Sequence, residues 1–207
     1  MPTQLDRRPL ASRSTGWAQA LAARLAATAI TPNQISVLSL LFAAAGGALI
    51  GFGEGALAFL AAALCVQLRL LCNLLDGMVA IEGGKSSAVG ALYNEMPDRI
   101  ADTVLLVPLG YASGLPWLGW AAALAAALTA YVRVLGGALG QRQDFSGVMA
   151  KQRRMAALTL ALVAAAIEAP VWGTRYALLV AGMVILAGSI FTCATRTMAI
   201  ARRLQIG

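Results

Sequence analysis

The residues best suited to chemistry lie in two consecutive apolar segments of the chain. The first segment carries Asn73 and Asp76, and the second carries Asn94, Asp98 and Asp102. An ionisable side chain at the centre of a bilayer costs about 2.5–3.5 kcal/mol, so a chain that keeps three carboxylates there is expected to use them. Carboxylate and carboxamide oxygens are ligands that suit a hard cation such as Mg²⁺. The two segments are therefore expected to build a polar, metal-binding centre.

The spacing of these residues is helical. Asn73, Asp76 and Ala80 stand at i, i+3 and i+7, so they share one face of a helix. Because a short loop joins the two segments, the helices are expected to run antiparallel and to bring their polar faces together. The second face repeats every fourth residue through Gly90, Asn94, Asp98 and Asp102.

Composition indicates an integral membrane protein. The 207-residue chain is 59% hydrophobic and only 12% charged, which lies outside the range of ordinary soluble domains. The apolar runs are continuous rather than alternating, which favours helices over a β-barrel. The net charge of +7 comes from Lys and Arg in loops between apolar runs, so it indicates a membrane surface and no nucleic-acid partner. The absence of histidine removes the commonest general base and metal ligand.

The predicted fold is an all-α integral membrane protein with six transmembrane helices and an N-terminal amphipathic surface helix. Residues 1–14 are predicted to form a polar tail and 14–29 the surface helix, which Thr31 and Pro32 separate from the first span. This gives a cytoplasmic tail and interfacial helix over 1–33 and a six-helix catalytic domain over 34–207. The predicted spans are 34–52, 55–81, 88–112, 116–140, 154–170 and 174–201.

The loop charges predict an orientation in a bacterial-type inner (plasma) membrane. Among the Lys and Arg residues of the loops, only Arg175 falls on the far side. By the positive-inside rule, both termini and the active site are expected on the cytoplasmic side. The residues on the basic side are Arg7, Arg8, Arg13, Arg24, Lys85, Arg142, Lys151, Arg153, Arg154, Arg196, Arg202 and Arg203.

The polar pattern resembles the signature of the CDP-alcohol phosphotransferases, integral-membrane enzymes of phospholipid synthesis. The family pattern is D-x2-D-G-x2-A-R-x8-G-x3-D-x3-D, and every spacing matches. The start of the first span, Thr31-Pro32-Asn33-x2-Ser36, also resembles the family. Two family Asp are amides here, and the family Arg is Ile81. In this chain the order reads Asn73-x2-Asp76-Gly77-x2-Ala80-x9-Gly90-x3-Asn94-x3-Asp98.

The resemblance implies transfer of a phosphatidyl (substituted phosphate) group from a CDP-linked lipid, such as CDP-diacylglycerol, to an acceptor hydroxyl, with release of CMP. It implies Asp98 as the catalytic base, with Asp102 one turn further as the second candidate. The implied cofactor is Mg²⁺, with Mn²⁺ as an alternative, and the implied assembly is a homodimer in contact with membrane lipids. The implied metal ligands are Asn73, Asp76, Asn94 and Asp98.

The same resemblance suggests binding residues for both substrates. Lys85 could replace the cation that Ile81 lacks. Basic residues near the fourth and fifth spans suggest a phosphorylated alcohol as acceptor. The nucleotide candidates are Asn33, Gly77, Ala80, Lys85 and Gly90. The acceptor candidates are Arg133, Lys151, Arg153 and Arg154.

Structural alternatives exist for these residues. Asp98 and Asp102 could form buried ion pairs with Arg69, Arg99 or Arg133, and the glycines could serve helix packing. Asn33 could act only as a helix cap, Lys85 could be a solvated loop residue, and the basic cluster could only anchor the helices to lipid.

Other functions remain open as well. A site with two or three carboxylates instead of four could hold one metal ion or bind metal weakly before the nucleotide arrives. The alternatives to an enzyme are a catalytically impaired, nucleotide-binding pseudoenzyme of the same fold and an ion-coupled transporter.

Overall fold

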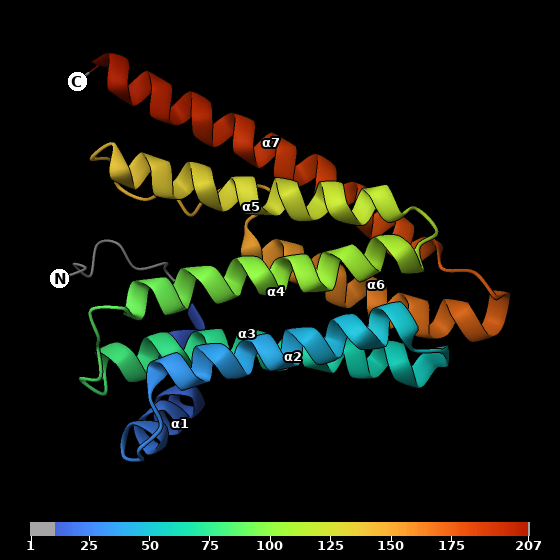
Figure 1. Cartoon of the computed structure of the whole chain (residues 1–207), viewed down its shortest axis with the longest axis horizontal. Helices are drawn as coiled ribbons and strands as arrows, with labels where there is room; N and C mark the ends of the chain where they lie inside the picture. Colours follow the sequence, from blue (N-terminus) through green and yellow to red (C-terminus); the bar gives the residue numbers. More distant parts are fainter. Residues whose placement is uncertain (1–10, 207) are drawn as a thin grey trace.

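The computed structural model describes residues 11–206, and these residues form helices joined by short loops (Figure 1). The predicted all-α fold is confirmed, and the six long helices match the predicted spans closely. The elements are η2 (Ala11–Ser14), α1 (Gly16–Ala26), α2 (Pro32–Phe52), α3 (Gly55–Ile81), α4 (Gly90–Ala112), α5 (Pro116–Ala138), α6 (Lys151–Trp172) and α7 (Tyr176–Ile206).

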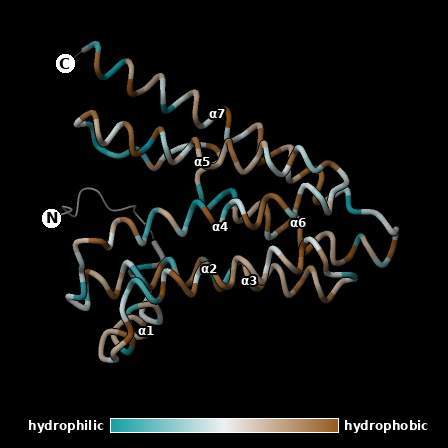
Figure 2. The backbone as a smooth tube through the Cα atoms, in the orientation of Figure 1, coloured by the Kyte–Doolittle hydropathy of each residue, from teal (hydrophilic) through white to brown (hydrophobic). Residues whose placement is uncertain are grey.

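Five of these helices, α2, α3, α5, α6 and α7, are long and apolar enough to cross a membrane. Helix α4 falls short because its N-terminal part carries Glu95, Asp98, Arg99 and Asp102. It nevertheless lies alongside α2 and α5 within the bundle (Figure 1), and its hydrophilic residues stand out among mostly hydrophobic neighbours (Figure 2). The count of six spans therefore depends on α4, of whose charged side chains Asp98 and Asp102 are buried by the other helices.

Helix α2 packs against both α3 and α4, and two adjacent glycines explain how. A Cβ atom at Gly47 would lie 2.3 Å from the carbonyl oxygen of Val104, and one at Gly46 would lie 3.1 Å from Cβ of Cys65. Small residues let helix backbones approach this closely in membranes. Helix α3 also packs against α6, and α4 against α5. Side chains of α3 and α4 contact each other through hydrogen bonds such as Arg69 to Asp102 and Asn73 to Asp98. Helix α2 packs against both helices, and α6 packs against α3.

A large apolar cluster fills the part of the bundle beyond the polar residues of α4. It includes Phe59 on α3, Leu105 and Leu109 on α4, and Leu158 and Leu162 on α6, all fully buried. Asp98 and Asp102 lie one to two turns before Leu105 on the same helix. Because the residues of this core are apolar and fully buried, the carboxylates next to it need partners from within the protein.

The N-terminal helix covers the outside of α3. Ala18 and Ala22 of α1 are buried against Leu75 and Met78 of α3. Thr31 caps α2 in a capping box with Gln34. Residues 1–10 of the predicted tail lie outside the described part of the chain.

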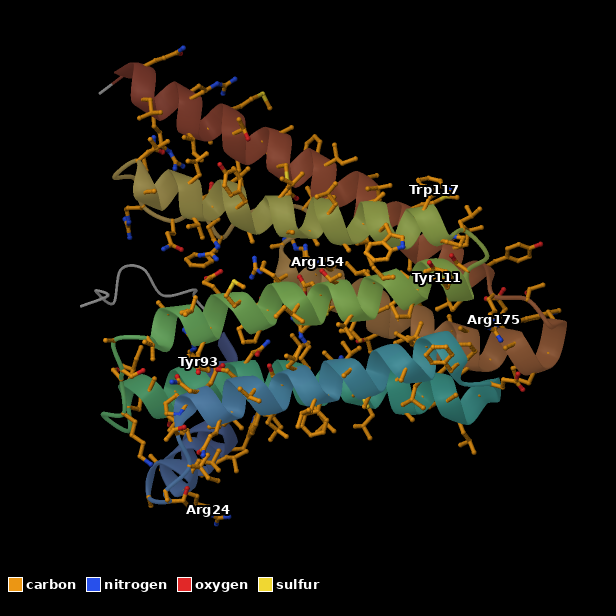
Figure 3. The ribbon with its side chains drawn as sticks, viewed as in Figure 1. Arg24, Tyr93, Tyr111, Trp117, Arg154 and Arg175 are labelled. Carbon is orange, nitrogen blue, oxygen red and sulfur yellow. The ribbon has the colours of Figure 1, made fainter. Side chains whose placement is uncertain are left out.

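Two predicted details need correction or comment. The predicted span 154–170 is too short, because α6 runs through Pro170 to Trp172 and ends at Gly173, whose φ is 68°. Arg24 and Arg175 lie at opposite ends of the bundle (Figure 3), as the loop charges predict. Arg175 also stacks on Phe59, with its guanidinium carbon 5.5 Å from the ring centre.

Candidate active site

Asp102 joins three helices through two ion pairs. It is 2% exposed. Its Oδ1 accepts a hydrogen bond of 2.7 Å from Arg69 of α3, and its Oδ2 accepts one of 2.5 Å from Arg154 of α6. Figure 3 shows Arg154 at the centre of the bundle. Both carboxylate oxygens of Asp102 are therefore held by buried guanidinium groups, which favours a structural role over that of a catalytic base.

Asp98 lies one turn earlier on α4 and has a more varied environment. Its Oδ1 accepts hydrogen bonds from Nδ2 of Asn73, at 3.0 Å, and from the ammonium of Lys151. Arg69 lies 3.5 Å from the same oxygen. The other oxygen, Oδ2, accepts no hydrogen bond from residues 11–206, and the guanidinium of Arg99 lies 3.6 Å from it. Asp98 thus keeps one oxygen with room for a further ligand or proton.

Asp76 is the third buried carboxylate. Its Oδ2 accepts a 2.7 Å hydrogen bond from the hydroxyl of Ser36 on α2, and its Oδ1 accepts one of 2.6 Å from the backbone N–H of Gly77. The charges of Lys151 and Asp98 both act on it, so these groups share one polar region. Each oxygen of Asp76 accepts one hydrogen bond and can accept or coordinate a second partner.

The charges in this region balance. Three buried carboxylates face three buried cationic side chains across α3, α4 and α6, and Arg99 lies at the edge. Buried charges of one sign are stable only when they are paired in this way. We call this group the ion-pair cluster. Its members are Asp76, Asp98, Asp102, Arg69, Lys151 and Arg154.

The remaining residues of the predicted signature lie at its edge. Asn94 is exposed and lies one turn before Asp98 on the same face of α4. A Cβ atom at Gly77 would have the guanidinium of Arg13 3.5 Å away, and one at Gly90 would have the Ser87 hydroxyl at 3.4 Å. Among the described residues, no neighbouring backbone approaches either glycine closely enough to require its lack of a side chain.

The predicted nucleotide contacts are only partly assembled. The ammonium of Lys85 donates to the carbonyl oxygens of Thr28 and Ile30, at 2.5 and 3.2 Å, and so ties the α3–α4 loop to the α1–α2 linker. Asn33 is half-buried at the start of α2, one turn before Ser36, so the two share a face toward α3. Ala80 is half-buried, one turn beyond Asp76 on α3.

The predicted acceptor cluster is divided between two places. Lys151 and Arg154 belong to the ion-pair cluster, whereas Arg153 is exposed and lies 3.4 Å from the carbonyl oxygen of Gly147. Arg133 is buried and binds both carboxylate oxygens of Glu95 at 2.6 Å. The four residues therefore do not form one phosphate-binding group.

Beside Arg133, a cavity of about 350 Å³ opens between the α5–α6 loop and α7. Its lining includes Gln143, which accepts a hydrogen bond from Arg133, together with Arg142, Asp144 and Arg203. The cavity is lined by charged and amide side chains and stands apart from the buried carboxylates. It is a surface feature next to the candidate acceptor residue.

The donor set fits one divalent ion better than two. Within residues 11–206, no three His, Cys, Asp or Glu side chains converge on a metal position. Asp76 and Oδ2 of Asp98 could ligate one ion. Asn73 uses its amide nitrogen to bind Asp98, so its carbonyl oxygen is not needed for that contact and could be a third ligand. Oxygen ligands of this kind suit Mg²⁺ or Mn²⁺.

Sequence reasoning missed two functional contacts. Ser36 holds Asp76, and its place one turn after Asn33 in a segment that already resembled the family was a usable signal. Glu95 neutralises Arg133, and no pattern linked two residues 38 positions apart.

The fold of this chain resembles that of known membrane enzymes. No protein-family model matches the chain. The inner membrane protein YnbA of Escherichia coli (strain K12) is 32% identical over 79 residues, a stretch covering 38% of this chain and only 39% of that protein. Mycobacterium tuberculosis phosphatidylinositol phosphate synthase, in complex with manganese and citrate, aligns with a TM-score of 0.75 at 21% identity, covering 88% of each chain. The same enzyme with CDP-DAG bound gives 0.73 at 22%, covering 88% of this chain and 92% of that one. The chain therefore has the fold of this phosphatidylinositol phosphate synthase, an all-helical fold of the kind that its sequence signature predicts.

Proposed function

We propose that this protein is a CDP-alcohol phosphotransferase that moves a substituted phosphate group from a CDP-linked lipid to an acceptor hydroxyl and releases CMP. One observation carries the proposal. In a fold shared with an enzyme solved with CDP-DAG, Asp76 and Asp98 stand in one buried polar region at the signature spacing. An intramembrane carboxylate is a functional-site residue by default because it is costly to keep.

Asp98 is the proposed base. A carboxylate within hydrogen-bond reach of a hydroxyl can take its proton as the oxygen attacks phosphorus. Oδ2 of Asp98 is the free oxygen for this step, while Lys151 and Asn73 fix the carboxylate through Oδ1. Asp102 has no such free oxygen, so we assign it to holding Arg69 and Arg154.

The proposed cofactor is a divalent ion, Mg²⁺ or Mn²⁺, held by Asp76, Asp98 and the carbonyl oxygen of Asn73. When bound, such an ion neutralises the pyrophosphate of the donor and the charge that develops on the leaving phosphate. The chain's own contribution is to orient these ligands, and Ser36 does so directly by fixing Asp76.

The nucleotide is proposed to lie against Gly77, Ala80, Gly90 and Asn33, because no neighbouring backbone of the described residues packs closely on the two glycines. Lys85 reaches this region only by releasing the carbonyl oxygens of Thr28 and Ile30. Its primary role is therefore proposed to be tying the α1–α2 linker to the α3–α4 loop.

A phosphorylated acceptor would bind at Arg133 in this proposal. Its partner Glu95 is more exposed than Arg133, with 36% of the side chain accessible against 6%, so Glu95 can swing away when an anion arrives. Lys151 and Arg154 are committed to carboxylates and are not assigned to the acceptor.

The orientation of the protein in the membrane is proposed from the distribution of Lys and Arg in its loops. The chain is an integral membrane protein, and we propose that its active site, both termini and the interfacial segment 1–33 face the cytoplasm of a bacterial-type inner membrane. The six-helix part, 34–207, is proposed to act as a homodimer.

The test is CMP release. Purified protein in lipid nanodiscs is supplied with CDP-diacylglycerol, Mg²⁺ or Mn²⁺, and single acceptors that include glycerol, inositol and their phosphates. CMP release that needs an acceptor and disappears in Asp98→Asn supports the proposal. Asp144→Asn, in the α5–α6 loop, serves as the matched control because it removes a carboxylate outside the ion-pair cluster.

A second candidate is a nucleotide-binding pseudoenzyme. The balanced charges of the ion-pair cluster favour it, because a site already neutralised by Arg and Lys needs no metal to be stable. CDP binding without CMP release, with every acceptor and either metal, would establish this candidate instead.

A further inference from the structure

We infer that Lys151 is a built-in cation of the active site, which takes the place of a second divalent ion and limits this protein to a single one. The inference deepens the proposed function and rests on it for the meaning of the site. The contacts that carry it are those of Lys151, Asp98 and Asn73.

The first step is the saturation of one oxygen. A carboxylate oxygen has two lone pairs, and Oδ1 of Asp98 already accepts from Asn73 and from Lys151, with Arg69 at 3.5 Å. This oxygen has no free position for a metal ion. Asp98 can therefore ligate one ion through Oδ2, but it cannot bridge two ions with both oxygens.

The second step concerns residue 73. The amide nitrogen of Asn73 lies 3.0 Å from Oδ1 of Asp98. An Asp in the same rotamer would place a second carboxylate oxygen there, and two carboxylates so close cannot both stay ionised unless a cation lies between them. The amide removes this repulsion and donates a hydrogen bond instead. Asn73 avoids a second negative charge beside Asp98, and Lys151 neutralises the charge of Asp98, so no second ion is needed there.

The third step is that Lys151 is fixed. It is 8% exposed, it is the first residue of α6, and Arg154 one turn later is anchored on Asp102. The flexible stem of a lysine would otherwise let the ammonium leave for water. Because α6 packs against α3, the ammonium is held between Asp98 and the region of Asp76, where its charge acts on both.

The experiment measures Mn²⁺ binding to the purified full-length protein without nucleotide, through the electron paramagnetic resonance signal of free Mn²⁺. The wild type is expected to bind no more than one ion. The double variant Asn73→Asp with Lys151→Met restores a carboxylate and removes the ammonium, so it is expected to gain a second site. Lys151→Met alone should bind the first ion at least about tenfold more tightly, because the charges repel at an effective dielectric constant of about 20.

Arg153→Met is the matched control. It removes the same unit of charge from the same turn of α6, but its side chain is exposed and contacts only a loop carbonyl. Two tight Mn²⁺ sites in the wild type would overturn the inference, and this measurement needs no variant to fold. Equal affinities for the wild type, Lys151→Met and Arg153→Met would overturn it as well.

Failure of the inference and failure of the proposed function are separate outcomes. Two Mn²⁺ ions together with acceptor-dependent CMP release would refute the role of Lys151 and leave the phosphotransferase assignment intact. One ion, a second site gained in the double variant, and no CMP release would support the built-in cation and refute the phosphotransferase.

Discussion

Replacing Asp102 by Asn is predicted to destabilise the protein strongly, because this carboxylate is the only anion that both Arg69 and Arg154 contact within hydrogen-bond distance in the described part of the chain. An Asn at the same place keeps one acceptor oxygen but loses the charge. Its amide nitrogen would face a guanidinium, donor against donor. Two arginines on α3 and α6 would then be buried without a full counter-charge.

The expected magnitude follows from the burial of all three groups. Asp102 is 2% exposed, Arg154 1% and Arg69 0%. Removing one partner of such a buried pair costs about 3–5 kcal/mol. For a chain of this length each kcal/mol lowers the melting temperature by about 2–4 °C, so the midpoint should fall by about 6–20 °C. By comparison, Asp144→Asn removes a loop carboxylate whose nearest cation, Arg203, is half exposed at 3.9 Å, and it should change little.

The assay is the loss of monodisperse protein in detergent after heating, followed by size-exclusion chromatography. Adding Arg154→Met to Asp102→Asn should recover part of the loss, because it removes one of the two unpaired cations. Surviving folded Asp102→Asn should still release CMP, whereas Asp98→Asn should not. A midpoint within about 2 °C of the wild type, with activity abolished, would refute the reasoning and make Asp102 a catalytic group.

Three further outcomes follow from single contacts. Ser36→Ala removes the hydroxyl that fixes Asp76, and kcat/KM for CMP release should fall about tenfold or more because the bond is to a buried charge; an unchanged value would remove Ser36 from the site. Lys85→Met frees two carbonyl groups of the α1–α2 linker, so limited proteolysis there should accelerate; an unaltered cleavage pattern would contradict this tie. Gly47→Leu would drive a side chain into the Val104 carbonyl, 2.3 Å from its Cβ, so no monodisperse protein is expected, and a normal yield would refute the packing described for α2 and α4.

Much of the fold could be predicted because local signals and burial agree. Continuous apolar runs mark the helices, and Thr31 and Pro32 mark the start of α2. Pro170 misled the prediction, since a proline near the end of a helix reads as a stop but is tolerated in a membrane helix. Helix α4 was predicted from polar residues that recur every fourth position, although its charges lower the hydropathy of the segment.

The site could be predicted less completely. Periodicity tells which residues share a face of a helix, but not which distant helix that face meets. Lys151 contacts Asp98 from 53 positions away, and Arg154 contacts Asp102 from 52. The residue types of Lys151 and Arg154 suit phosphate and carboxylate equally, so the sequence alone suggested an acceptor site and left a lipid-anchoring role open. Only the packing of α6 against α3 assigns them to the carboxylates.

The most direct test of the account is CMP release by the wild-type protein in nanodiscs that contain CDP-diacylglycerol, with a divalent ion and a panel of acceptor alcohols. The account predicts CMP formation that requires both metal and acceptor, that is lost in Asp76→Asn and Asp98→Asn, and that persists in Asp144→Asn. Absence of CMP with every acceptor, from protein that still binds CDP, would contradict it.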